Sequence, residues 1–165
     1  MPDVNISEHF SISITNTMEM MLESDVNIAV PEYIEPNTSG YDVTGVIGLA
    51  GDIQGVALVG MDLLTAKKIA TKLIDADENE FDEDKNNSEL ADAIGEFSNI
   101  IIGGAKSRLG KTVSITYPCI VISENHVAHR PTHIPTLKLT CQSEYGSFSI
   151  EYTIQQVGSQ SANAA

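Results

Sequence analysis

Residues 88–110, SELADAIGEFSNIIIGGAKSRLG, form the stretch of sequence that decides the fold. Asparagine and serine residues precede position 89, and Gly110 follows position 109, which is typical of the start and the end of a helix. At about 100° per residue, the apolar side chains of this stretch fall on one stripe. They are Leu90, Ile94, Phe97, Ile101, Ala105 and Leu109. The stretch therefore predicts a long helix over 89–109 that packs against a core.

The polar side of this helix carries the candidate site. Glu96 and Asn99 are three residues apart, so their side chains are surface neighbours, roughly 5–6 Å apart at Cβ, and one partner can contact both. Asp92 lies one turn earlier on the same face, and Gly103 and Lys106 follow. A glycine at 103 lowers the helix surface and admits a second backbone, although it costs about 1 kcal/mol of helix propensity. The spacing indicates a binding or catalytic site on this face.

An ordinary solvated helix face is the alternative interpretation of the same residues. Charged side chains on a helix are usually only solvated. The spacing Glu-x-x-Asn also recurs at residues 83–86, within a charged segment. The string by itself therefore does not decide between a site and a solvated face.

Length and composition indicate a globular protein. A chain of 165 residues suits one domain, or one domain built from two similar halves. Hydrophobic residues make up 42% of the chain and charged residues 19%, which argues against wholesale disorder. We expect a single domain over 1–156 and a disordered tail over 157–165.

The formal charge of −14 bounds the class of partner. No lysine or arginine precedes Lys67, so nucleic acid and anionic membranes are not expected as partners, because both need clustered cations. The chain has two cysteines and no apolar leader after Met1, and no apolar run reaches about 18 residues. These features predict a cytoplasmic protein with reduced cysteines.

Periodicity along the rest of the chain predicts an α+β fold with a largely antiparallel sheet. Helices are expected over 6–24 and, after Asp62 as a cap, over 63–74. Residues 26–34 are expected to be extended, and strands are expected over 41–49, 54–59, 112–116, 120–123, 136–142 and 147–155. Each half offers a helix followed by strands and a hairpin, which predicts two halves that mirror one another.

Metal and nucleophile motifs are not convincing. The acidic residues 75–84 start like a calcium loop but place Glu80 and Asn86 where glycine and glutamate are required, so we expect a solvated loop. His126, His129 and His133 could hold zinc, but prolines interrupt them and we expect surface loop histidines. There is no Gly-x-Ser-x-Gly elbow and no phosphate-binding glycine loop after a strand. We expect no cofactor or metal of the chain's own.

Residues 93–104, AIGEFSNIIIGG, carry a resemblance to a known family. With Asp92 before them, they are similar to the signature helix of the CheX, CheC and FliY family of chemotaxis phosphatases, in which Glu96 and Asn99 fill the signature positions. Weaker similarity extends over 5–155, including 46–55 and 114–118. Pro118 follows Asn99 sooner than in the family pattern. The first helix lacks a second Glu and Asn pair, so the chain resembles CheX rather than CheC.

The resemblance implies a CheC-like fold, with long helices packed on one side of the sheet. It also implies that the protein is a phosphatase. The substrate would be the aspartyl phosphate of a CheY-like response regulator, with Asn99 orienting a water molecule and Glu96 pairing with a receiver lysine. Asp92, Gly103 and Lys106 are expected to contact the partner, and Mg²⁺ would belong to the receiver. The alternative is a noncatalytic module that binds a receiver or a flagellar-switch protein.

The resemblance also implies a homodimer joined through sheet edges, which would remove an exposed edge strand. The final hairpin, over 136–155, is rich in threonine and isoleucine. We expect the dimer contact there.

Overall fold

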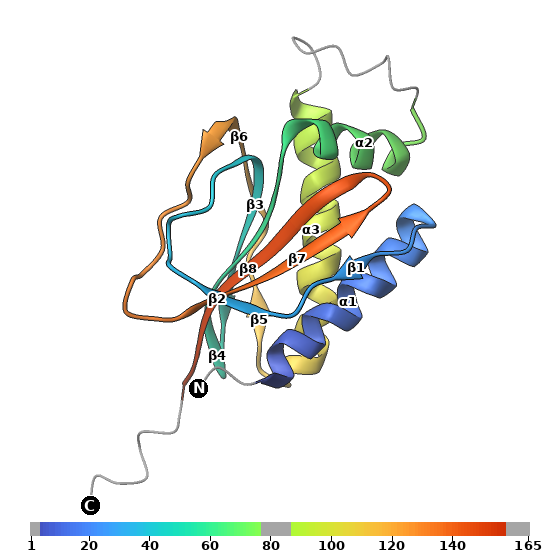
Figure 1. Ribbon diagram of the computed structural model, residues 1–165. Coiled ribbons are helices and arrows are strands. Elements are labelled where there is room, and N and C mark those ends of the chain that lie inside the picture. Colours follow the sequence, from blue (N-terminus) through green and yellow to red (C-terminus); the bar gives the residue numbers. More distant parts are fainter. Residues whose placement is uncertain (1–3, 77–86, 158–165) are drawn as a thin grey trace, which may run out of the picture.

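The computed structural model describes residues 4–76 and 87–157. These residues form one eight-stranded sheet with three helices, and the two long helices lie behind the sheet in the view of Figure 1. The helices are α1 (Val4–Leu22), α2 (Leu63–Leu73) and α3 (Asn87–Leu109). The strands are β1 (Asn27–Ile28), β2 (Glu32–Ile34), β3 (Tyr41–Ala50), β4 (Ile53–Met61), β5 (Ser114–Ile115), β6 (Cys119–His126), β7 (Thr136–Ser143) and β8 (Gly146–Gln156). The predicted α+β fold is confirmed, and all strand pairs are antiparallel.

The sheet order reveals the two halves. One path across the sheet runs β2, β7, β8, β4, β3 and β6, with β4 and β8 paired at the centre. If β2 is exchanged with β6, β3 with β7 and β4 with β8, the result is the same series of strands read from the opposite edge. Each half thus adds one strand to the hairpin of the other half, and the predicted pseudo-twofold arrangement is confirmed.

The core lies between the sheet and the two long helices. Phe10, Ile14 and Met18 of α1 are fully buried, and the Phe10 ring stacks on Tyr152 of β8 with ring centroids 4.9 Å apart. The helix ends at Leu22, two residues before the predicted boundary. Burial of this many apolar side chains contributes most of the stability, at about 25 cal/mol per Å² of apolar surface.

Gly104 sets the distance between α1 and α3. A Cβ at Gly104 would overlap the hydroxyl of Ser13, and that hydroxyl donates a hydrogen bond of 2.6 Å to the Ile101 carbonyl. The two helices therefore approach each other where both residues are small. At Gly103 a Cβ would lie at an ordinary 3.7 Å from Ile115 Cδ1, so no other part of the described chain crowds this glycine, and the approach of a partner there stays a prediction.

The shorter elements follow the predicted pattern with shifted ends. The stretch expected to be extended over 26–34 forms two short strands that both pair with β7. Asp62 caps α2 as predicted, since its side chain accepts a hydrogen bond of 2.7 Å from Thr65 N. Ile69 and Ala70 of α2 are buried, whereas Leu64 is 63% exposed.

The final hairpin lies inside the sheet. β8 is paired on both sides, with β4 and β7, and β7 also pairs with β1 and β2. The prediction that this hairpin supplies a free edge is therefore wrong. In the described residues the outer strands are β1 and β2 on one side and β5 and β6 on the other.

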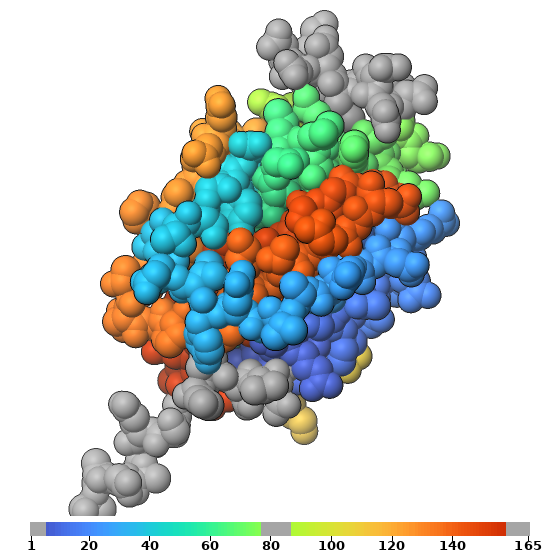
Figure 2. Space-filling view, in the orientation of Figure 1, coloured from blue at the N-terminus to red at the C-terminus, as the bar shows by residue number. Residues whose placement is uncertain are grey.

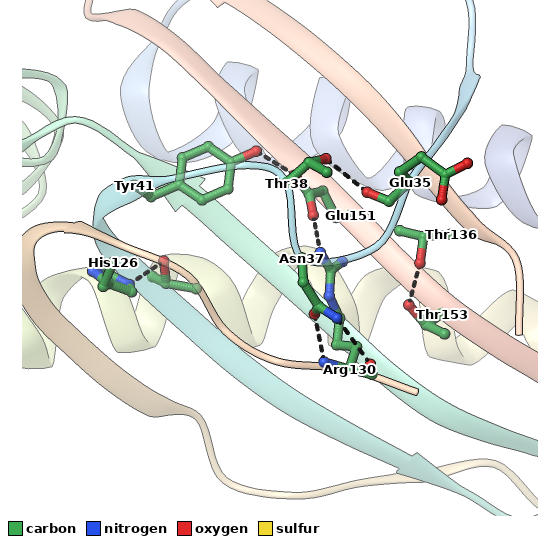
Figure 3. Close-up of polar contacts among 10 residues, drawn as sticks. Glu35, Asn37, Thr38, Tyr41, His126, Arg130, Thr136, Glu151 and Thr153 are labelled. Carbon is green, nitrogen blue, oxygen red and sulfur yellow. Dashed lines mark hydrogen bonds and ion pairs between the residues drawn. The ribbon is translucent and has the colours of Figure 1, made fainter. Parts of the chain in front are cut away.

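Two connections cover part of the face of the sheet opposite the helices. In Figure 2 the chain between β1 and β3, which includes β2 and is coloured blue to cyan, runs beside the orange-red β7–β8 hairpin, which remains visible. The second connection joins β6 to β7 and contains Arg130. The Arg130 guanidinium contacts the Glu151 carboxylate at 2.7 Å, and the Tyr41 hydroxyl donates a hydrogen bond of 2.6 Å to the same carboxylate (Figure 3). Asn37 accepts a hydrogen bond from Arg130 N at 2.7 Å, which joins the two connections above β8.

Some predictions fall outside the described residues. These are the acidic segment from 77 onward, the second Glu-x-x-Asn match at 83–86, and residues 158–165 of the predicted tail. Val157, at the start of that tail, donates its N–H to the Asp52 carbonyl at 2.9 Å.

Candidate functional site

Packing fixes the rotation of α3 about its axis. Ile94, Phe97 and Ile101 are fully buried, and Phe97 meets Phe148 of β8 edge-on with ring centroids 5.6 Å apart. The predicted apolar stripe is confirmed, with its last member Leu109 half-buried. A Cβ at Gly45 of β3 would overlap Ser98, so α3 lies close on the sheet. The residues on the other side of the helix consequently face outward.

The Glu-Asn pair lines an open groove of about 270 Å³. One wall comes from α3, with Asp92, Glu96 and Asn99, and the other comes from the chain that joins β5 to β6. We call this hollow the Asn99 groove. Its lining residues are Ala91, Asp92, Gly95, Glu96, Asn99, Tyr117, Pro118 and Ile120. Glu96 is exposed and Asn99 is half-buried, so the carboxylate and the carboxamide are both reachable from solvent.

A second depression lies on the other side of Glu96. It has a volume of about 570 Å³, and its lining residues are Met21, Leu73, Ile74, Asp75, Ala76, Glu89, Asp92, Ala93 and Glu96. Asp92 and Glu96 line both hollows and therefore form a ridge between them, which we call the acidic ridge. Among the described residues that line the two hollows, none is a lysine, arginine or histidine. The carboxylates of the acidic ridge favour a cationic group on a partner.

The structure brings together three of the five residues singled out in the sequence. Asp92, Glu96 and Asn99 line one groove, whereas Gly103 and Lys106 lie further along α3 and do not line it. Gly103 is half-buried against Ile115 of β5, and Lys106 is half-buried as well.

Sequence reasoning missed the opposite wall of the groove. Tyr117, Pro118 and Ile120 reach Asn99 only because β5 and β6 both pair with β3, beneath α3. The Tyr-Pro pair between two short strand patterns was the available signal, but no local pattern tells which helix such a connection crosses.

The histidines and cysteines do not form a metal site in the part of the chain that the structure describes, where no three ligand side chains gather. His126 was expected in a surface loop, which is wrong: it ends β6, and its two ring nitrogens lie 2.7 Å from Thr44 Oγ1 and 2.7 Å from the Ser123 carbonyl. His129 and His133 are exposed. Cys119 is exposed and Cys141 is buried.

No helix within the described residues is both long enough and apolar enough to cross a membrane.

The fold and the groove define a class of protein, namely a CheC-like α+β domain whose longest helix carries an exposed acid and a half-buried amide in one open groove. A CheC-like superfamily protein from Shewanella sp. PV-4 has the same fold, with a TM-score of 0.79 and 24% identity over 93% of this chain and 99% of that chain. Residues 43–142 match the family model described as chemotaxis phosphatase CheX. The chain belongs to the CheX family.

Two further structures share the fold. The CheX–CheY–BeF₃–Mg²⁺ complex from Borrelia burgdorferi matches with a TM-score of 0.75 and 22% identity, over 93% of this chain and 100% of that chain. FliY from Thermotoga maritima matches with a TM-score of 0.65 and 18% identity, over 93% of this chain and 87% of that chain. A comparison with curated protein sequences gives no significant match.

Proposed function

We propose that the chain is a phosphatase that hydrolyses the aspartyl phosphate of a CheY-like response regulator. The observation that carries the proposal is the placement of Glu96 and Asn99 together on the wall of one open groove, in a member of the CheX family. A groove that is open on its outer side suits a substrate that is itself a folded protein.

Asn99 supplies the chemistry in this proposal. Hydrolysis of an acyl phosphate needs an in-line water molecule and charge stabilisation more than it needs a covalent partner. The Asn99 carboxamide both accepts and donates hydrogen bonds, so it can hold a water molecule and a phosphoryl oxygen at once. Its half-buried position limits the directions from which water reaches it. Asn99 therefore orients the attacking water.

Glu96 anchors the substrate rather than attacking it. A carboxylate next to a phosphoryl group is repelled by it, so Glu96 needs a cation between the two, and we assign the lysine of the receiver to this place. Asp92 stands on the same acidic ridge and adds a second carboxylate to it. The related Borrelia complex contains CheY, BeF₃ and Mg²⁺. By analogy, we place Mg²⁺ on the receiver and no cofactor on this chain.

The remaining partner contacts extend the same surface. Gly103 and Lys106 lie beyond the groove on α3, where only a partner as wide as a folded domain reaches them. The homodimer predicted from the family resemblance also remains part of this proposal. Its contact belongs at an outer strand, because the outer strands in the described residues are β1, β2, β5 and β6. The substrate is an intracellular signalling protein, which agrees with the cytoplasmic location predicted from the sequence.

A noncatalytic module is the second candidate. In this candidate function the chain, which shares its fold with FliY, binds a receiver or a switch protein without turnover. In that case the acidic ridge would still bind the partner's cation, but Asn99 would have no effect on the lifetime of the phosphoryl group.

Steady-state phosphate release from a phosphorylated receiver of the same genome separates the two functions. We expect Asn99→Ala to keep receiver binding and to lose roughly 10²-fold or more of the acceleration, as when one positioned hydrogen-bonding group is removed from other enzymes. Glu96→Lys should weaken binding and turnover together. Asn16→Ala, at an exposed position of α1, is the matched control and should behave as wild type. Equal acceleration by wild type and Asn99→Ala would refute the catalytic role.

A further inference from the structure

Tyr117 is the most exposed large side chain beside the candidate site. Its side chain is 95% exposed, and it lines the Asn99 groove opposite Glu96 and Asn99. Single exposed aromatic residues are common on protein surfaces and need no explanation by themselves. The position of Tyr117 is what distinguishes it, because it is one of the residues that line the groove of the Glu-Asn pair.

The backbone holds Tyr117 in place from both sides. Before it, Thr116 N donates to the Gly48 carbonyl at 3.0 Å, and Gly48 N donates to Thr116 Oγ1 at 2.9 Å. After it, Cys119 begins β6 and pairs with Val46 of the same strand β3. Pro118 has a fixed φ and restricts the residue before it to extended conformations. The backbone that carries Tyr117 is thus preorganised, so a partner that covers this residue does not have to order the main chain there.

A receiver that docks at Asn99, as in the proposed function, has to cover more surface than the groove itself offers. A groove of about 270 Å³ holds a few side chains at most. A specific protein complex buries roughly 800 Å² on each partner. A receiver that brings its phosphoryl group to Asn99 therefore extends over the walls of the groove, and Tyr117 forms one of those walls.

We propose that Tyr117 is the aromatic anchor that docks the receiver, packing on an apolar patch beside the phosphorylated aspartate. This inference rests on the proposed function and adds to it the residue that determines affinity. Tyrosine is enriched among the few residues that carry most of the energy of protein interfaces. The acidic ridge and Tyr117 then act on different features of the receiver, the ridge on a cation and Tyr117 on apolar surface. Because Tyr117 touches the receiver surface and not the reacting atoms, it acts on binding and leaves the chemical step unchanged.

Kinetics of Tyr117 variants test this anchor. We expect Tyr117→Ala to raise KM for the phosphorylated receiver roughly tenfold or more, with kcat within about twofold of wild type, which is the pattern of lost uniform binding. Tyr117→Phe should keep KM near the wild-type value, because the ring and not the hydroxyl makes the contact. Tyr33→Ala is the matched control: Tyr33 is 60% exposed but belongs to β2, at the other edge of the sheet. An unchanged KM for Tyr117→Ala, or a fall in kcat alone, would overturn the anchor.

A binding measurement separates this inference from the proposed function. Calorimetric titration with the receiver in its BeF₃⁻–Mg²⁺ state reports affinity without turnover. If wild type binds but does not accelerate dephosphorylation, and Tyr117→Ala binds roughly tenfold more weakly, then the anchor stands and the phosphatase proposal fails. If wild type is active and Tyr117→Ala binds like Tyr33→Ala, then the anchor fails and the phosphatase proposal stands. If wild type does not bind the receiver in this state, both fail.

Discussion

Glu151 is a buried carboxylate whose charge is balanced by a single cation in the described residues. The Arg130 and Glu151 side chains are only 2% and 1% exposed. Burial, followed by the nearby Glu151 charge, raises the pKa of Tyr41, so Tyr41 remains a hydrogen-bond donor to that carboxylate. Arg130 Nε and Nη1 have no hydrogen-bond partner among the described residues. Arg130 therefore depends on Glu151 for its counter-charge.

We predict that Glu151→Gln destabilises the protein by about 3–5 kcal/mol, because it leaves the Arg130 charge buried and uncompensated. Replacing both residues, as Arg130→Met with Glu151→Gln, should cost clearly less than the sum of the two single changes. Urea unfolding of the four proteins measures this coupling. Additive effects, or a loss below about 1 kcal/mol for Glu151→Gln, would contradict the account.

At the scale of single residues, the sequence predicted the face of α3 but not its surroundings. The period of Leu90, Ile94 and Phe97 fixes which side is buried, so Glu96 had to face outward. By contrast, the pairing of Arg130 with Glu151 and the approach of Tyr117 to Asn99 join residues far apart in the chain. The spacing of apolar residues within one element does not predict such contacts. They depend on which strands pair and on the register of each pair.

At the scale of elements, α3 carries two adjacent glycines with different surroundings. A Cβ at Gly104 would overlap Ser13 of α1, while a Cβ at Gly103 would lie 3.7 Å from Ile115 Cδ1. Within the described chain, the close approach of another helix thus occurs at Gly104, while the approach of a partner at Gly103 remains a prediction. The sequence could not tell them apart, because a shift of one residue is a rotation of about 100° on the helix and only the partner helix shows which side is crowded.

We predict opposite effects for the two alanine variants. Gly103→Ala should be neutral or stabilising by up to about 1 kcal/mol, because alanine favours the helix. Gly104→Ala should be destabilising by about 1–3 kcal/mol relative to Gly103→Ala, because Ser13 must leave its hydrogen bond to Ile101 or α1 must move. Thermal or urea unfolding of the pair checks the difference. Similar stabilities for both variants would mean that α1 and α3 are not closely packed at Gly104.

At the scale of the whole molecule, the described residues share one sheet and one core. The expectation of a single domain over 1–156 remains a prediction. Burial in the core changes the pKa values of several acidic side chains, and these changes make the stability of the protein depend on pH above about 9. Burial raises the pKa of the Cys141 thiol from 9.0 to about 12. Burial also raises the pKa values of Tyr41 and Tyr152.

We predict that the free energy of unfolding falls as the pH rises from about 9 toward 12. Above pH 9 the unfolded chain loses the Cys141 proton, whereas the native protein keeps it, so the native state binds more protons and stability decreases with pH. Cys141→Ala should reduce this slope, and Cys119→Ala, at an exposed position, is the control. Urea unfolding across this pH range measures it. A slope that Cys141→Ala leaves unchanged would show that the thiol is not buried in solution.

The architecture of the whole molecule was the part most accessible from sequence. Alternating β-branched residues and turn glycines predicted both hairpins, and two similar halves predicted the symmetry of the sheet. We expected the last hairpin at an edge of the sheet, however, and it lies inside. Local patterns predict each hairpin but not which strand of the other half pairs with it. β2 crosses to the second half and closes that edge.

The most direct test of the account is the lifetime of the acyl phosphate on the receiver. A CheY-like receiver is phosphorylated with a radioactive label, freed of phosphodonor, and followed in Mg²⁺ with a catalytic amount of wild type, of Asn99→Ala, or of no added protein. We expect wild type to shorten the lifetime well below that of the receiver alone, and Asn99→Ala to restore it to roughly the uncatalysed value. If the lifetime with wild type equals that of the receiver alone, or if Asn99→Ala shortens it as much as wild type, the central claim is wrong.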